Sequence, residues 1–160
     1  APWVGEGELR LLSITGEQID SQRIVFELKG HSRGYFNIKP SLAESNSPQQ
    51  LFLRLEIGNH AEHYFFDEYK ELDLLEPTFE SALHRVKGGF VLELTPDCVV
   101  RDLLLLVDKL DHNARVATGL TTLLPGERVE IPIHSSQNLE LVQFLDPEVL
   151  RHGNQLVVNK

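Results

Sequence analysis

The sequence is poor in several residue types that would each indicate a particular class of protein. Cys98 is the single cysteine, which excludes an internal disulfide and a cysteine-rich zinc site and leaves the redox compartment undetermined. No apolar stretch approaches the ~18 residues that a membrane-spanning helix needs. No basic segment followed by an apolar one opens the chain, as it would in a signal peptide. We therefore expect no membrane partner.

Positive charge is scarce as well. The chain has 15 Lys and Arg against 24 Asp and Glu, a formal net charge of −9 at pH 7 and a sequence pI near 5.2. Such a surface repels nucleic acid and anionic lipid, because both carry dense negative charge. The sequence therefore predicts no nucleic acid partner.

Methionine is absent altogether, including at position 1. We expect the chain to be trimmed by processing or to be a piece of a longer protein. Its 160 residues fit one domain of average size, or two small β-sandwich domains. With 41% hydrophobic and 24% charged residues the composition is close to that of ordinary globular proteins, which predicts a folded core.

Sequence motifs for nucleotide binding and for hydrolysis are also missing. The chain contains no G-x-G-x-x-G, no G-x-x-x-x-G-K-[ST] and no G-x-S-x-G. A glycosidase needs two carboxylates across one cleft, but the acidic residues here follow strand faces exposed to water or fall in the segment 67–77. We predict no catalytic residue and no cofactor in this chain.

Short runs with strand character occupy the first half, at residues 9–14, 22–28, 51–57 and 61–66. Gly58 and Asn59 separate the last two runs and favour the positive φ of a tight hairpin. In the run 51–57 apolar and polar residues alternate, which predicts one face toward the core and one toward water. The expected inward residues are Leu51, Leu53, Leu55 and Ile57, and the expected outward residues are Arg54 and Glu56.

Two segments without periodicity organise the chain. Residues 39–50 carry prolines and small polar residues and predict a loop. Residues 67–77 are acidic and predict a connector between two halves of similar size. The expected domains are residues 1–76 and 77–160.

The second half repeats the pattern of short runs and turns. Turns are expected at residues 88–89, 96–97 and 124–127, and Pro132 indicates an edge position in its strand. The run 99–110 also fits a helical stripe, but its neighbours favour a strand. The expected strands are 79–86, 90–95, 99–110, 114–124 and 128–134. Turns at this spacing predict an all-β fold of two antiparallel immunoglobulin-like β-sandwich domains in tandem.

A few residues could carry chemistry. His60 and His63 could bind one zinc ion only if His60 lay in the turn, because residues three apart on a strand face opposite sides, and no third ligand has a recognised spacing. We therefore predict no metal. Cys98 begins an apolar run and is expected to be buried, with Arg101 alone as a cationic neighbour that could activate the thiol.

Aromatic side chains could form a platform for a sugar ring. Those at strand positions are expected in the core, so only Trp3 and Tyr69 are expected to be exposed. The residues that would bind a ligand stay undetermined, and a carbohydrate-binding module stays open as an alternative. The candidates are Trp3, Tyr35, Phe36, Tyr64, Phe65, Phe66 and Tyr69.

Two groups of motifs carry a resemblance to a known family. Residues 50–57, 63–66 and 70–74 form an F-L-x-L-x-L strand, a Y-F-F strand and a K-x-L-x-L exit. These motifs are similar to those of the penultimate immunoglobulin-like domain of glycoside hydrolase family 2 β-mannosidases. Residues 89–95, 114–116 and 123–127 are similar to the last domain, with its G-F-x-L-x-L-T run and late L-L-P-G-E turn. The resemblance covers residues 8–135. It departs from the family in lacking a strand before position 1 and aromatic residues near 118–120.

The resemblance implies a non-catalytic role for this chain. The two catalytic glutamates of the family lie in a (β/α)₈ barrel upstream of these domains, and 160 residues leave no room for a barrel of ~250 residues. It implies a parent protein that hydrolyses terminal β-mannosyl units with retention of configuration. The implied partners are the upstream barrel and a mannose-containing oligosaccharide. A carbohydrate-binding or protein-interaction β-sandwich module is the alternative.

Overall fold

The computed structural model describes residues 2–157. Within them the chain forms two compact units that divide between Asp73 and Leu74. Strands account for most of the regular structure, and every strand pairing is antiparallel. None of the helices in this described part is long and apolar enough to cross a membrane.

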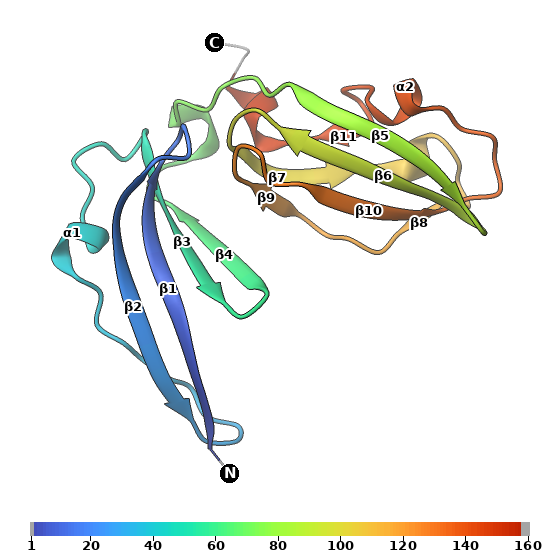
Figure 1. Cartoon of the computed structure of the whole chain (residues 1–160). Coiled ribbons are helices and arrows are strands. Elements are labelled where there is room, and N and C mark those ends of the chain that lie inside the picture. Colours follow the sequence, from blue (N-terminus) through green and yellow to red (C-terminus); the bar gives the residue numbers. More distant parts are fainter. Residues whose placement is uncertain (1, 158–160) are drawn as a thin grey trace. The chain divides into compact units, whose positions relative to one another are not determined.

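The first unit is built on one four-stranded sheet in the order β2-β1-β3-β4 (Figure 1). Two antiparallel hairpins supply it, β1 with β2 and β3 with β4. The predicted hairpin at Gly58 is confirmed, and Gly58 has a φ of +60°. The elements are β1 (Trp3–Ser13), β2 (Gln18–Leu28), α1 (Pro40–Ala43), β3 (Leu51–Ile57), β4 (His60–Phe65) and the 3-10 turn η1 (Tyr69–Glu71).

The strand β1 begins six residues before the run that the apolar pattern predicts, which starts at Leu9. The extra part contains Gly5 and Gly7, and their lack of a side chain is what lets neighbours approach. A Cβ on Gly5 would lie 2.7 Å from the ring of Phe26, and one on Gly7 would lie 2.7 Å from the carbonyl oxygen of Glu56. Glycine weakens a strand signal in sequence while permitting this close packing.

One face of this sheet carries a hydrophobic cluster of the first unit. Leucine side chains from β1 and β3 cluster there with Ile24 of β2. The segment 39–50, predicted as a loop, contains the short helix α1, whose Leu42 is fully buried in the same cluster. The buried members of the cluster are Leu9, Leu11, Ile24, Leu42 and Leu53.

The opposite face of β3 is not open to water, so the prediction for Arg54 was wrong. Arg54 retains only 8% of its exposure, about as little as Leu53 at 7%. Its guanidinium donates from Nε to the Glu56 carboxylate at 2.6 Å. Beside it Phe52 is fully buried and stacks on Phe65 with 4.8 Å between ring centroids. Alternation marked two faces correctly, but it could not show that both are covered.

The second unit is a β-sandwich of two antiparallel sheets. A four-stranded sheet has the order β5-β6-β10-β8, and a three-stranded sheet has the order β11-β7-β9. Apolar residues from both sheets form one continuous core, which includes Leu92 of β6 and Val100 of β7. The strands are β5 (Phe79–Val86), β6 (Gly89–Pro96), β7 (Val100–Leu105), β8 (Arg115–Val116), β9 (Thr121–Leu123), β10 (Val129–His134) and β11 (Leu150–Arg151). The short helical segments are η2 (Val107–Lys109), α2 (Leu141–Phe144) and η3 (Gly153–Leu156).

The predicted fold class is confirmed, since the chain is all-β with antiparallel sheets in a sandwich-like arrangement and only short helices. The ambiguous run 99–110 is a strand up to Leu105 and then a 3-10 turn, so its helical stripe reflects burial of its apolar side chains. The run 114–124 holds two short strands, β8 and β9. Pro132 sits where β10 has one hydrogen-bonded neighbour, because β8 pairs only with Ile133 and His134.

A single buried side chain ties the end of the second unit to its beginning. Asn154 in η3 has no solvent exposure. Its Nδ2 donates to the carbonyl oxygens of Leu75, at 2.7 Å, and Val99, at 2.8 Å, while its Oδ1 accepts from the backbone N–H of Arg101 at 3.0 Å. One amide thus satisfies three backbone groups that lie outside the strand ladders. We call this arrangement the Asn154 clamp.

Candidate functional site

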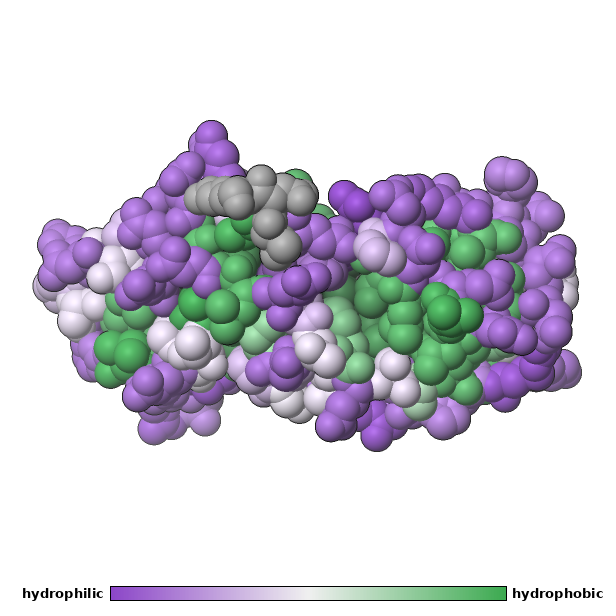
Figure 2. All heavy atoms as spheres, turned by 90° about the horizontal axis from the view of Figure 1, so that it is seen from above, coloured by the Kyte–Doolittle hydropathy of each residue, from purple (hydrophilic) through white to green (hydrophobic). Residues whose placement is uncertain are grey.

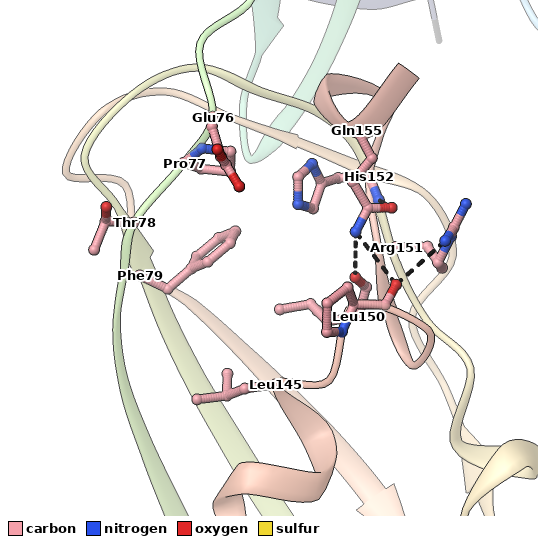
Figure 3. A pocket seen from close by; sticks show the side chains of 10 residues that line it. Glu76, Pro77, Thr78, Phe79, Leu145, Leu150, Arg151, His152 and Gln155 are labelled. Carbon is pink, nitrogen blue, oxygen red and sulfur yellow. Dashed lines mark hydrogen bonds between the residues drawn. The ribbon is translucent and has the colours of Figure 1, made fainter. Parts of the chain in front are cut away.

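The second unit has a pocket of about 540 Å³ at one end of its sandwich (Figure 3). It lies between the start of β5, an edge strand of the larger sheet, and the segment from β11 to η3, which borders the smaller sheet. Both edges of the sandwich therefore contribute to it. The lining residues are Glu76, Pro77, Thr78, Phe79, Leu145, Pro147, Leu150, Arg151, His152 and Gln155.

Hydrogen bonds fix the two walls of the pocket. On the β5 side, the backbone N–H of Thr78 donates to the Asp97 carboxylate at 2.8 Å. On the other side, the Gln155 amide donates to the carbonyl oxygens of Leu150, at 3.1 Å, and Pro147, at 3.3 Å. Because hydrogen bonds anchor both walls to neighbouring parts of the second unit, the pocket belongs to the folded sandwich.

Two rings in edge-to-face contact line one side of this space. The rings of Phe79 and His152 lie 6.0 Å apart between centroids and are tilted by 62°, and Figure 3 shows both directed into the pocket. His152 Nδ1 is buried and has no hydrogen-bond partner within residues 2–157. Burial, assisted by the positive charge of Arg151, lowers the pKa of His152 to about 4. The imidazole is therefore uncharged at neutral pH and acts as a second ring wall.

The charged groups at the pocket are one acid and one base. Glu76 is exposed, and Figure 3 shows its carboxylate above the space between the rings. Arg151 donates from Nη1 to the Pro147 carbonyl at 3.3 Å and lies 3.8 Å from Glu148. Thr78 adds a hydroxyl. The pocket combines an apolar floor with a few polar groups at its border.

This arrangement suits binding better than bond cleavage. Glycoside hydrolysis needs a second carboxylate facing the first, but Glu76 is the only acidic residue among those that line the pocket. A nucleophile activated by histidine needs that histidine as a base, and a pKa near 4 makes His152 a weak one. The pocket therefore has the geometry of a small-molecule binding site.

The structure separates the candidate metal ligands. His60 and His63 both belong to β4, where residues three apart point to opposite faces. His63 lies beside Arg54, with 3.4 Å between Nε2 and Nη1, while His60 is exposed at the hairpin end. Among residues 2–157 no group of three or more His, Cys, Asp and Glu side chains could hold a metal ion.

Cys98 is buried, as predicted. It retains 7% of its exposure, and its Sγ lies 3.8 Å from the Leu75 carbonyl oxygen. Burial, together with the neighbouring Asp97 carboxylate, raises the pKa of the thiol to about 11. The positive charge of Arg101 does not offset this rise. The thiol is therefore protonated and unreactive at neutral pH.

The prediction for the aromatic residues was right for Trp3 and wrong for several others. Trp3 is 56% exposed and packs against Phe26 with 5.0 Å between centroids, whereas Tyr69 is half-buried. Tyr35 and Tyr64 are more exposed than Trp3, at 90% and 62%. Tyr64 lies on the edge strand β4, which leaves its ring uncovered despite its strand position. Phe36 is also exposed, and Phe65 and Phe66 are half-buried.

Sequence reasoning missed the residues of the pocket. Phe79 was expected only as the first residue of a strand, and His152 lay in a C-terminal segment for which no strand was predicted. Their only shared feature in sequence is an aromatic ring at each end of the second unit. The topology that brings the two ends together could not be predicted from either segment alone.

The chain is similar in fold to part of a β-D-mannosidase. The crystal structure of this enzyme from Dictyoglomus thermophilum matches it with a TM-score of 0.65 over 94% of the chain, at 16% sequence identity. The chain spans 18% of the length of that enzyme. No family profile matches the sequence, and no curated protein matches it either.

The surface of both units carries patches of hydrophobic residues surrounded by hydrophilic ones (Figure 2).

Proposed function

We propose that this chain is the non-catalytic C-terminal accessory region of a β-mannosidase and that it packs against the catalytic barrel of the same polypeptide. The observation that supports this most strongly is the fold match over 94% of the chain to a β-D-mannosidase of which the chain spans only 18%. A region of that size is too small to hold a barrel of ~250 residues. The proposed parent enzyme acts on terminal β-mannosyl residues with retention.

Each of the two domains predicted from the sequence has a proposed counterpart in such an enzyme. Residues 1–76 would correspond to the penultimate immunoglobulin-like domain and residues 77–160 to the last one, as the sequence motifs suggest. The single sheet of the first unit is consistent with a domain that lacks part of a two-sheet sandwich.

The reading frame that encodes this chain provides the most direct test. We expect a (β/α)₈ domain of ~250 residues upstream in the same frame, and a frame without one would contradict the proposal. The second arm uses protein. The complete polypeptide should hydrolyse an aryl β-mannoside, whereas the 160-residue chain alone should not. Turnover by the isolated chain that is abolished by replacing one acidic residue would also contradict it.

Packing against the barrel can be measured separately. The barrel-containing part expressed alone should unfold at a lower temperature than when it is mixed or fused with this chain, because an interface that binds only the folded state stabilises it. Equal unfolding temperatures would favour the alternative, an interaction module that does not pack against a barrel.

A further inference from the structure

We propose that the pocket between β5 and η3 binds a single pyranose ring, either as a free sugar or as the terminal residue of an oligosaccharide. This binding is non-catalytic and goes beyond the accessory role proposed above. The pocket is lined only by residues of the second unit, so the inference does not depend on any other part of the polypeptide.

The size and shape of the pocket fit a small ring. Its volume of about 540 Å³ lies within the range of about 300–1,000 Å³ that small-molecule sites occupy. The contacting rings of Phe79 and His152, with centroids 6.0 Å apart, form one wall, and Pro77, Leu145 and Leu150 supply further apolar surface. A pyranose presents a face of C–H groups that packs on such rings and side chains, since aromatic faces carry partial negative charge.

The charges of the pocket favour a neutral ligand. The Glu76 carboxylate would repel an anion at the opening of the pocket. The positive charge of Arg151 reaches the imidazole of His152, because it contributes to the low pKa of that ring. That same positive potential disfavours a bound ammonium group beside the ring. A neutral, polyhydroxylated molecule avoids both penalties.

The polar groups at the border fit hydroxyl donors and acceptors. The Glu76 carboxylate can accept hydrogen bonds from two adjacent sugar hydroxyls, and bonds to a charged acceptor are about twice as strong as neutral ones. The Thr78 hydroxyl can donate or accept on the same side. The Gln155 amide is already bonded to the backbone and holds the opposite wall in place.

The test is an NMR titration of the whole 160-residue chain, labelled with ¹⁵N, with methyl β-mannopyranoside and methyl β-glucopyranoside. We expect saturable shifts confined to the amides around residues 76–79 and 150–155, with a Kd on the order of millimolar for so small a ligand. Mannobiose distinguishes a free sugar from the terminal residue of an oligosaccharide. If the pocket binds mannobiose more tightly than the methyl glycoside, its ligand is the end of an oligosaccharide; if it binds both equally, its ligand is a free sugar.

Two further ligands test for a different kind of site in the same pocket. Cyclohexanol keeps the ring size without the set of hydroxyls, and tetramethylammonium tests for a cation site. If either binds as tightly as the pyranosides, the pocket is an apolar or a cation site and the proposal is overturned. Absence of saturable shifts, or shifts centred on the first unit, overturns it as well.

Matched variants locate the binding. Glu76→Gln should weaken pyranose binding at least ~5-fold, because it replaces a charged acceptor by a neutral one. Glu80→Gln, which removes an exposed acid of the adjoining strand β5 outside the pocket, should leave the Kd unchanged. Phe79→Leu should abolish detectable binding while the amide spectrum stays dispersed. Equal affinity in Glu76→Gln and wild type would refute the site.

Discussion

Replacement of Asn154 tests how much one buried amide contributes to the second unit. Asn154→Ala removes two donors and one acceptor at once and leaves the carbonyls of Leu75 and Val99 and the N–H of Arg101 without their partner. A buried group left unpaired costs about 1–3 kcal/mol. Since the small space that alanine leaves can admit a water molecule that rebonds part of the set, we expect a loss of about 3–5 kcal/mol. That is a large share of the ~5–15 kcal/mol of a typical domain.

In the variant Asn154→Asp the stability of the second unit should depend on pH. Asparagine donates to two carbonyl oxygens, but an aspartate carboxylate would face both of them without a proton to share. The folded state therefore favours the protonated acid, so the pKa of this aspartate should be raised above its unfolded value of about 3.9. A group with a raised folded pKa contributes its stability at low pH and loses it as pH rises. The gap in stability between wild type and Asn154→Asp should widen from pH 4 to pH 7.

The assay is urea denaturation with Cys98 as the probe, because its buried thiol becomes reactive only when the second unit opens. Asn113→Ala is the control, since Asn113 is exposed and its side chain makes none of the hydrogen bonds identified between residues 2 and 157; it should change stability by less than about 0.5 kcal/mol. If Asn154→Ala loses no more stability than Asn113→Ala, the clamp does not stabilise the unit. The same conclusion follows if the difference in stability between wild type and Asn154→Asp does not change with pH.

The remaining predictions concern other buried groups. Leu53→Ala should lower the free energy of unfolding by about 2–5 kcal/mol, because it leaves a cavity in the first core. Arg54→Ala should lower it by about 1–2 kcal/mol, because it removes a hydrogen bond to the half-buried Glu56. Denaturation monitored by Trp3 fluorescence checks both, and a loss below about 0.5 kcal/mol for Arg54→Ala would mean that the guanidinium does not stabilise the unit. Cys98 should react with a thiol reagent at pH 8 far more slowly than a model thiol and accelerate toward pH 11; reaction at the free rate would show that it is accessible. The pKa of His152 is lowered to about 4, so the unfolded state binds the proton first and stability should fall as pH drops from about 6.5 to 4; a His152→Phe variant that keeps the full acid sensitivity would disprove this.

Sequence patterns predicted the elements that depend on residues close together in the chain. Strict alternation in residues 51–57 and the glycine after it predict the β3–β4 hairpin, because a positive φ at Gly58 is a local requirement. The period-2 pattern did not predict the burial of Arg54, since the same pattern arises whether the polar face meets water or an ion pair. Whether a charged residue is covered depends on contacts distant in sequence.

The pocket and the clamp depend entirely on such distant contacts. Phe79 and His152 meet only because β11 pairs with β7 and returns the chain to the edge next to β5. Asn154 follows a glycine in a segment that reads as an ordinary turn, and its three partners lie far upstream. Turn chemistry predicts asparagine at such a place but not its burial.

The Asn154 clamp also has a consequence for the order in which the chain can fold during its synthesis. It joins positions that are 79 residues apart, almost the whole length of the second unit. Translation delivers β5 to β10 long before Asn154, so these strands can pair while the carbonyls of Leu75 and Val99 still bind water. We infer that the growing unit remains incomplete on the ribosome until its last segment has left the exit tunnel. Until then the carbonyl oxygens of Leu75 and Val99 and the ring of Phe79 lack the contacts that Asn154 and His152 provide in the folded unit.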